Sequence, residues 1–534
     1  MASTSIFAIV GASLAGASAA QTLRKEGFDG RVVLVGDERE LPYERPPLSK
    51  GYLIGDETKD VIYVHDADWY SDHNIELRLG TRATGLDPKA HIVELADGQS
   101  LDYTKLLLAT GSSPRRLNIP GAELDGVNYL RKVEDSERLK AAFSRGEPVV
   151  VIGAGWIGLE TAAAARSYGA PVTIVEPSPT PLHRVLGPEL GEVFAQLHRD
   201  HEVTLLLGTG VTEIRGKDGR VHEVLTSDGQ MLAATTVIVG VGATPNIELA
   251  QAAGLAVDNG VLTNAALRTS DPDIHAAGDI ANAEHPLLGR RIRVEHWANA
   301  KRSGTAAARA MLGQQVSYDH VPYFFTDQYD LSMEYTGFVA GDETAEIVYR
   351  GDVNSREFLA FWLVDGRVAA GMNVNVSGVT KDIEALVQSR EQVDVERLRD
   401  SNVPLKEVAS GPTKKEHSGR ARGGLKEKLA QGMSFARHKV TDRFQNADST
   451  LVTELAVGEA RILSINGEKA AVYRDEQGDV YAVSATCTHM GCTVDWNGED
   501  KSWDCPCHGS RFDHTGAVLN GPAKRDLPSM KTDF

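Results

Sequence analysis

Apolar residues gather in short strand-like runs along the chain, and two of these runs begin closely similar blocks. Each block reads as an apolar strand, a glycine-rich turn and an alanine-rich helix. The first is SIFAIVGASLAGASAAQTLRKEG (5–27), and the second starts VVVIGAGWIGLETAAAARSYG (149–169). This order of elements is typical of parallel α/β sheets. It predicts two doubly wound dinucleotide-binding folds in one chain.

The turn of the first block fits the dinucleotide motif G-x-G-x-x-G with one departure. Gly11 and Gly16 take the first and last places, and Ser13 takes the middle one. The first glycine permits the tight turn, the last permits close packing of helix on strand, and the helix N-terminus attracts a pyrophosphate. The next strand ends in Asp37 and Glu38, where an acid is expected at the adenosine ribose. A bare tight turn without a nucleotide is the alternative.

The second block carries the complete motif, with Gly153, Gly155 and Gly158. Glu176 ends the following strand, and no arginine follows it in the stretch Pro177–Pro179. A carboxylate at this place accepts from the ribose 2′-hydroxyl and repels a 2′-phosphate. The block therefore predicts an NAD(H) site.

Three more segments suggest a flavoenzyme that uses a nicotinamide cofactor. Two of them, LLLATGSSPRRL (106–117) and VIVGVGATPN (237–246), end strands at small-residue turns. The third, TSDPDIHAAGDIA (269–281), places an acid after a strand, where it can bind a ribityl hydroxyl. The candidate cofactor-binding residues here are Ala109, Thr110, Gly111, Gly242 and Asp279.

Composition narrows the class of protein. The 534 residues are 42% apolar with 52 glycines, which suits a globular chain of three or four domains. The N-terminus lacks signal-peptide features and no apolar run approaches the roughly 20 residues of a membrane helix, so we expect a cytoplasmic protein. The net charge is −18. The sequence has no extended basic face with interleaved aromatic residues, so a nucleic-acid partner is not expected.

All four cysteines lie within residues 487–507. Cys487 and His489, followed by Cys505 and His508, give the pattern C-x-H…C-x-x-H, which matches the ligands of a Rieske [2Fe–2S] centre. A Cys2His2 zinc site is the alternative, although a one-residue gap between Cys and His is rare for zinc. Because no cysteine precedes residue 487, thiol–disulfide chemistry is excluded from the earlier part of the chain.

The segment LVGDERELPYERPPLSKGYL (34–53) resembles the NADH-dependent ferredoxin reductases of oxygenase systems, the putidaredoxin- and rhodocoxin-reductase-like flavoproteins related to apoptosis-inducing factor. The resemblance covers about residues 5–405. It implies that Arg45 and Lys50 lie at the flavin, that Glu160 pairs with Lys50 and meets the nicotinamide, and that Trp297 contacts the isoalloxazine ring. Lys50 and Glu160 are thus the expected catalytic residues. In PYFFTDQYD (322–330), Phe325 replaces the family's usual tryptophan.

The C-terminal cysteines resemble those of high-potential Rieske proteins. That resemblance implies a disulfide between Cys492 and Cys507 and a hydrogen bond from Ser510 to a cluster sulfide. Phe512 stands where such proteins have tyrosine, so one hydrogen bond to a cluster cysteine is lost. Losing this donor should lower the cluster potential.

The expected fold class is a two-dinucleotide-binding-domain α/β flavoprotein of glutathione-reductase type. An α+β C-terminal reductase domain and an all-β Rieske domain follow it. The predicted bounds are FAD domain 1–112 with 241–320, NAD domain 113–240, reductase C-terminal domain 321–405, linker 406–448 and Rieske domain 449–534.

Residues 411–443 carry a local charge of +6, from nine Lys/Arg and three Asp/Glu. A basic amphipathic helix at 424–440 would either dock on an acidic neighbour or touch a membrane surface.

These features predict an enzyme that passes electrons from NADH through FAD to its own [2Fe–2S] cluster. An external oxygenase or cytochrome is the expected acceptor, and the sequence is compatible with a homodimer. The alternative is a nucleotide-dependent redox-sensing protein of the apoptosis-inducing-factor type. Rapid reduction of one-electron acceptors would favour the enzyme, and a long-lived reduced flavin–NAD complex would favour the sensor.

Overall fold

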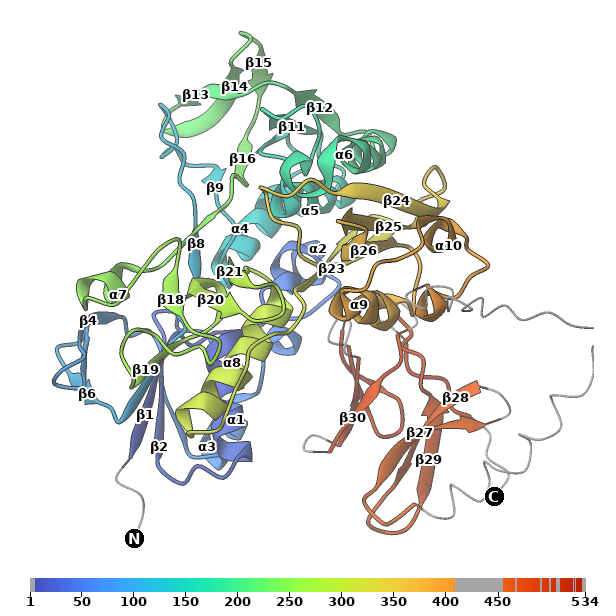
Figure 1. Ribbon diagram of the computed structural model, residues 1–534. Coiled ribbons are helices and arrows are strands. Elements are labelled where there is room, and N and C mark those ends of the chain that lie inside the picture. Colours follow the sequence, from blue (N-terminus) through green and yellow to red (C-terminus); the bar gives the residue numbers. More distant parts are fainter. Residues whose placement is uncertain are drawn as a thin grey trace, which may run out of the picture. The chain divides into compact units, whose positions relative to one another are not determined.

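The structure is a computed structural model that describes residues 5–408, 455–465, 468–489, 492–498, 501–505, 510–521, 523 and 525–530. Two compact units are distinguished: Met1–Val376 with Asp382–Arg390, and Ser377–Lys381 with Glu391–Phe534. Figure 1 labels many of their elements. The basic helix predicted at 424–440 lies outside the described residues.

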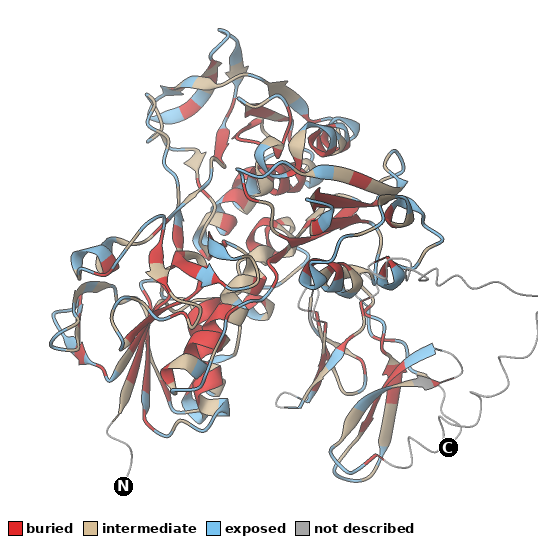
Figure 2. Ribbon diagram, viewed as in Figure 1, coloured by how far each residue is buried: buried red, intermediate tan, exposed pale blue. Residues whose placement is uncertain are grey.

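A parallel sheet with strand order β19-β7-β1-β2-β3 organises the N-terminal part of the first unit. Its strands are β1 (Ile6–Val10), β2 (Arg31–Val35), β3 (Ile75–Arg78), β7 (Lys105–Leu108) and β19 (Ile274–Ala276). Phe7 and Ile9 share a core with helices α1 (Leu14–Lys25) and α8 (Trp297–Met311). Ala8 and Val10 share the other core, with residues of a small antiparallel sheet. Both faces are covered, which is why β1 is apolar throughout and β2 and β7 are apolar and buried after their first residues (Figure 2).

The small sheet consists of β4 (Ala83–Asp87), β5 (Ile92–Leu95) and β6 (Ser100–Asp102). A further sheet, β18-β20-β21, consists of Val261–Thr263, Ala281–His285 and Arg290–Arg293. Shorter helices lie at Gly51–Ile54 (α2), Ala67–Asp72 (α3) and Glu248–Ala252 (α7).

A second parallel sheet repeats the arrangement with strand order β12-β11-β10-β16-β9. Its strands are β9 (Val127–Asn128), β10 (Val149–Ile152), β11 (Val172–Glu176), β12 (Thr204–Leu207) and β16 (Thr236–Val239). Helices α4 (Val133–Phe143), α5 (Trp156–Ser167) and α6 (His183–Asp200) belong to this part, as does the antiparallel sheet of β13 (Val211–Lys217), β14 (Arg220–Thr226) and β15 (Met231–Ala233). Two short strands, β8 (Ser112–Pro114) and β17 (Ala243–Pro245), pair where the chain enters and leaves this part.

A five-stranded antiparallel sheet, β22-β23-β26-β25-β24, completes the first unit together with all but the first two residues of helix α9 (Thr380–Ser389). Its strands are β22 (Tyr323–Gln328), β23 (Leu331–Gly337), β24 (Glu346–Asp352), β25 (Glu357–Val364) and β26 (Arg367–Val374). Met333, Phe358 and Trp362 share one hydrophobic core with Phe194 of α6 and Leu159 of α5. This shared core, against which Phe324 of β22 also packs, holds the antiparallel sheet against the helices of the second parallel sheet.

The described part of the second unit is mostly β structure. It contains a three-stranded antiparallel sheet of β27 (Ala460–Ile465), β28 (Glu468–Arg474) and β29 (Val480–Ser484). A four-stranded sheet consists of β30 (Asp495–Asn497), β31 (Ser502–Asp504), β32 (Arg511–Asp513) and β33 (Val518–Asn520). A short helix α10 (Val395–Arg399) precedes them. The two sheets agree with the all-β expectation for this region.

None of the described helices combines the length and hydropathy that crossing a bilayer requires.

Close packing of α8 on α1 positions the N-terminal part of α8 beside the first parallel sheet (Figure 1). A Cβ at Gly304 of α8 would lie 2.2 Å from the carbonyl oxygen of Ala15 in α1. The Ser303 hydroxyl also accepts a 2.9 Å hydrogen bond from the Gly278 N–H. Position 304 therefore has no room for a side chain.

We expect Gly304→Ala to lower the free energy of unfolding by about 1–3 kcal/mol, because the added methyl separates two helices in backbone contact. Urea unfolding followed by circular dichroism measures this change. Gly341→Ala is the control, since a Cβ there meets nothing within 4 Å, and it should change stability by less than about 0.5 kcal/mol. Equal stability of the two variants would contradict the packing argument.

Candidate functional site

A cavity of about 1240 Å³ lies in the first unit and is lined by both glycine turns. It extends to the segment between β2 and α2, the N-terminal turn of α5, the start of α8 and the first half of β22. This volume exceeds the roughly 300–1,000 Å³ of common small-molecule sites. It suits an extended dinucleotide with part of a second one beside it.

Most of the predicted site residues line this cavity. They are Gly11, Ser13, Asp37, Glu38, Arg45, Lys50, Ala109, Thr110, Gly111, Gly155, Glu160, Gly242, Asp279 and Trp297. Gly16, Gly153, Gly158 and Glu176 are not among the lining residues. The three glycines are instead needed by the backbone of the turns.

The first glycine turn is shaped by two close backbone approaches. Gly11 has φ +125°, and a Cβ there would lie 2.0 Å from the Ala109 carbonyl oxygen. A Cβ at Gly16 would lie 2.1 Å from the Gly11 carbonyl oxygen. Gly153 and Gly158 repeat both constraints in the second turn. Both turns therefore present a helix N-terminus in the form that favours a phosphate.

Two buried polar atoms at the cavity wall fit a bound ring system with hydrogen-bonding edges. The Nδ1 atom of His296 and the Nε1 atom of Trp297 have no hydrogen-bond partner within the described part of the chain, although both residues line the cavity. Burial lowers the pKa of His296 to about 4, so the imidazole is neutral at pH 7. Unsatisfied buried groups of this kind are costly unless a ligand meets them. The residues thus fit the flavin that the sequence predicts.

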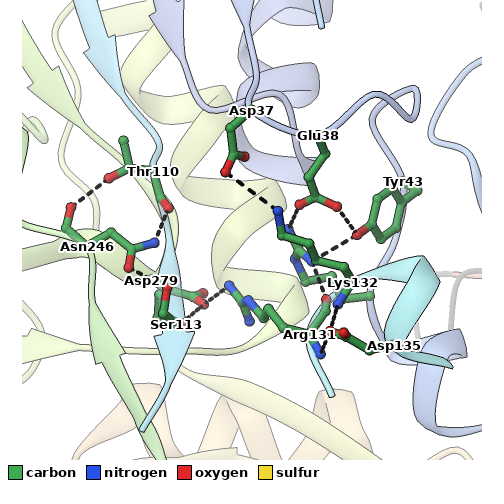
Figure 3. A network of polar contacts seen from close by, with 12 residues as sticks. Asp37, Glu38, Tyr43, Thr110, Ser113, Arg131, Lys132, Asp135, Asn246 and Asp279 are labelled. Atoms are coloured by element: carbon green, nitrogen blue, oxygen red, sulfur yellow. Dashed lines mark hydrogen bonds and ion pairs between the residues drawn. The ribbon is translucent and has the colours of Figure 1, made fainter. Parts of the chain in front are cut away.

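Arg45 is held at the cavity by the Glu38 carboxylate and the Tyr43 phenol, two residues that Figure 3 labels. Its guanidinium lies 2.9 Å from Glu38 Oε1, and the Tyr43 hydroxyl donates to Glu38 Oε2 at 2.6 Å. Burial alone would raise the pKa of Glu38, but Arg45 and Tyr43 outweigh it and hold this pKa below its usual value. Glu38 therefore stays ionised and orients Arg45, a role in addition to the ribose contact predicted from sequence.

The structure adds two basic residues that the sequence analysis missed. Arg131 lies 3.0 Å from Asp279 Oδ2, and Lys132 lies 3.6 Å from Asp37 (Figure 3). Both line the cavity, and the Arg131 carbonyl accepts a short hydrogen bond from Arg45. In the sequence, the one feature that could have pointed to them is that these two basic residues stand directly before the acidic first turn of α4. Arg131 and Lys132 are candidates to neutralise a phosphate.

The predicted catalytic pair forms in the structure. Lys50 Nζ lies 2.7 Å from Glu160 Oε1, with side-chain exposures of only 16% and 3%. Ser49 donates to Glu160 Oε2 at 2.5 Å, and Thr326 donates to Glu160 Oε1 at 2.6 Å. Lys50 also lies 5.5 Å from the ring centre of Phe325. The pair is a largely buried, hydrogen-bonded ion pair at the cavity wall, suited to orienting a reacting ring.

Glu176 accepts two backbone hydrogen bonds at the end of β11. The Ala154 N–H donates to Oε2 at 2.7 Å, and the Ser178 N–H donates to Oε1 at 2.8 Å. The carboxylate therefore stabilises the second glycine turn. Its assignment as a ribose acceptor stays a prediction.

Three of the four predicted cluster ligands are described. Cys487 and Cys505 are buried and lie outside any disulfide, and His489 follows Cys487 in the same loop. His508 lies outside the described residues. Within the ranges that are described, no group of three His, Cys, Asp or Glu side chains has metal-site geometry, so the four-ligand set stays a prediction.

Backbone hydrogen bonds shape the loops that carry these cysteines. The Cys487 N–H donates to the Cys492 carbonyl at 2.7 Å, and the Cys505 N–H donates to the Ser510 carbonyl at 2.7 Å. The Ser510 hydroxyl accepts from the Ala523 N–H at 3.0 Å, which ties this loop to the segment that contains Ala523. Cys492 is in a disulfide, and its predicted partner Cys507 lies outside the described residues. Phe512 is fully buried in a core with Cys487 and Cys505.

The fold and cavity define a pyridine-nucleotide-dependent flavoprotein oxidoreductase with a separate β-rich C-terminal part. Family models agree: residues 6–304 match pyridine nucleotide-disulphide oxidoreductases, 323–409 match the reductase C-terminal domain, and 448–531 match the Rieske [2Fe–2S] domain. The chain belongs to the ferredoxin reductase family of oxygenase systems, with a Rieske domain at its C-terminus. The predicted fold class is confirmed, and the cofactors are FAD, NAD(H) and a [2Fe–2S] cluster.

Two curated relatives illustrate the similarity. Rhodocoxin reductase of Rhodococcus erythropolis is 41% identical over 367 residues, covering 69% of this chain and 86% of the relative. The ferredoxin–NAD(+) reductase component of the anthranilate 1,2-dioxygenase system of Burkholderia cepacia is 40% identical over 401 residues, covering 75% and 98%. Among solved structures, the covalent putidaredoxin reductase–putidaredoxin complex matches with TM-score 0.74 and 36% identity, covering 76% of this chain and 99% of that one.

We expect NADH to be strongly preferred over NADPH, because the Glu176 carboxylate repels a 2′-phosphate. Glu176→Gln should reduce the ratio of kcat/KM with NADH to kcat/KM with NADPH by about tenfold, since it removes the repulsion between the carboxylate and the 2′-phosphate. Steady-state kinetics with both nucleotides measures the ratio. Glu202→Gln is the control: this side chain is 83% exposed and pairs with Arg166, so its loss should leave the ratio unchanged. An unchanged ratio in Glu176→Gln would show that the carboxylate serves only the turn.

Proposed function

We propose that the chain is a self-contained electron-transfer enzyme in which NADH reduces FAD, and electrons then pass to the Rieske cluster of the same chain. NADH gives up a hydride and leaves as NAD⁺, and its two electrons then depart singly to a one-electron acceptor. FAD, when bound, supplies the conversion between two-electron and one-electron transfer. The buried Lys50–Glu160 pair at the cavity wall is the observation that carries this proposal.

In this proposal the residues bind and orient rather than exchange covalent bonds. The first turn, with Gly11 and Ser13, and the Arg45 and Arg131 guanidinium groups would hold the FAD phosphates and ring. The second turn would hold NADH with its nicotinamide facing Glu160. Lys50 and Glu160 would set the approach of the hydride donor, which demands close positioning of the two rings.

The electrons are proposed to leave through the cluster because the flavoprotein part contains no thiol to accept them. Cys487, His489, Cys505 and His508 are the proposed ligands. Relatives are named as reductases of a rhodocoxin and of dioxygenase systems, so we propose an oxygenase or a cytochrome as the external acceptor. We also infer a cytoplasmic location; a homodimer is compatible with these features.

Removing either member of the ion pair tests the hydride step. We expect Lys50→Met and Glu160→Gln to slow flavin reduction by NADH about tenfold or more, while FAD content stays at one per chain, because the pair orients the donor. Stopped-flow absorbance at the flavin band measures the rate. Wild-type rates in both variants would exclude a catalytic role for the pair.

The cluster is tested separately by Cys505→Ser. We expect the purified variant to lose iron and keep FAD, because a hydroxyl is a poor substitute for the thiolate ligand. NADH should still reduce its flavin, whereas electron delivery beyond the flavin should fail. Retained iron with an unchanged Rieske spectrum would contradict the ligand assignment. A long-lived reduced flavin–NAD complex in the wild-type protein, with slow turnover of one-electron acceptors, would favour a redox sensor instead.

A further inference from the structure

A continuous chain of buried hydrogen bonds runs from Glu160 to helix α6. Thr326 donates to Glu160 Oε1 at 2.6 Å, and the Gln328 amide donates to the Thr326 hydroxyl at 3.1 Å. Gln328 Oε1 lies 3.0 Å from His198 Nε2. Thr326, Gln328 and His198 are 0%, 1% and 0% exposed, and none of the three lines the cavity.

The direction of this chain follows from the number of protons available. The ionised carboxylate of Glu160 can only accept, so the single hydroxyl proton of Thr326 points toward it. Thr326 must then accept from the NH₂ group of Gln328, which turns the amide oxygen toward His198. That oxygen needs a donor, so His198 carries its proton on Nε2. Every donor in this series of hydrogen bonds thus points toward Glu160.

The far end of the chain is consistent with this tautomer. Tyr329 places its hydroxyl 3.3 Å from His198 Nδ1, where a neutral ring accepts. Burial lowers the pKa of His198 to about 4, which keeps the ring neutral with one donor and one acceptor. Tyr329 has φ +55° at the turn between β22 and β23 and stacks on His201 at 3.7 Å. The turn is held against α6 although its backbone conformation is uncommon for a bulky residue.

We propose that His198 is a positioning residue for the Lys50–Glu160 pair, acting through Gln328 and Thr326. With the Nε2–H of His198 in place, the Gln328 amide has one orientation, and the Thr326 proton is reserved for Glu160. Without that donor the amide is free to turn its oxygen to Thr326, whose proton would then leave the carboxylate. Glu160 would lose one of its donors and Lys50 would lose its fixed partner.

This series of hydrogen bonds orients side chains and does not conduct protons. An amide cannot pass a proton from its oxygen to its nitrogen without forming an unstable tautomer, so Gln328 interrupts any relay. What the chain provides is preorganisation: three segments far apart in the sequence fix one carboxylate before any nucleotide binds. This inference rests on the proposed role of the Lys50–Glu160 pair in hydride transfer.

Matched substitutions test the positioning role by stopped-flow flavin reduction. Thr326→Val should slow reduction by NADH about tenfold, as expected for a lost hydrogen bond to a charged group, and Thr326→Ser should restore the rate. His198→Asn should slow reduction, whereas His198→Gln should be close to wild type, because the Gln amide reaches the place of Nε2 and the Asn amide does not. The NADH dissociation constant should change by less than about twofold in all four. His275→Asn controls for the loss of another buried neutral histidine, on β19.

The tautomer of His198 provides a readout that does not depend on turnover. Selectively ¹⁵N-labelled histidine, with the His198 signal assigned by its loss in His198→Gln, should show an Nε2–H tautomer. In Glu160→Gln the amide oxygen should take the place of Oε1, which accepts from both Lys50 and Thr326, so the Nε2–H tautomer should persist. An Nδ1–H tautomer in the wild-type protein would overturn the proposal.

The two hypotheses fail separately in these experiments. If Lys50→Met and Glu160→Gln slow reduction but Thr326→Val and His198→Asn do not, the proposed function stands and the positioning role is wrong. If none of the four slows reduction, the role of the ion pair itself is wrong, and with it the reason for positioning Glu160.

Discussion

The three parts of the first unit depend on one another through the ion pair between Lys50 and Glu160. Lys50 follows β2, Glu160 lies in α5, and the threonine that donates to Glu160 lies in β22. Taking two charges out of water costs several kcal/mol for each ion unless good geometry and further hydrogen bonds compensate. Ser49 and Thr326 supply those bonds. The pair can therefore be buried only when all three segments are in place, which couples assembly of the site to assembly of the fold.

The path of the backbone around the cavity is set by close contacts between backbone atoms rather than by side-chain contacts. In each glycine turn a carbonyl oxygen occupies the place where a Cβ would stand, so that strand, turn and helix pack in backbone contact. The same solution appears at Gly304, where α8 meets α1. Small residues thus bring helix N-termini and main-chain amides to the cavity wall, and long side chains such as Arg45 and Arg131 provide the charge.

Much of the fold could be predicted from the sequence, because its signals are local. Two strand–turn–helix blocks with glycines at fixed spacing predicted both parallel sheets, and short apolar strands predicted the β-rich C-terminal part. The family resemblance also brought Lys50 and Glu160 together across 110 positions of the sequence. Arg131 and Lys132 were missed because nothing near them in the sequence indicates that they reach a cavity built mainly by other segments. The second role of Glu38, holding Arg45, depends on Tyr43 and on burial, which no local pattern reveals.

The chain from Glu160 to His198 shows why polar networks are harder to predict than cores. Thr326 and Gln328 occupy alternate positions of β22, and both side chains are buried. The usual strand pattern would place apolar residues at these two inward-facing positions. Two buried polar side chains on one face of a strand are expensive unless each finds a partner. Here the partners lie in α5 and α6, so the polar face of β22 makes sense only once those helices are packed on it. The same strand carries Phe324 and Phe325 at the cavity wall. One short element thus supplies aromatic surface to the cofactor site and a donor to the carboxylate behind it, and its sequence reflects both demands at once.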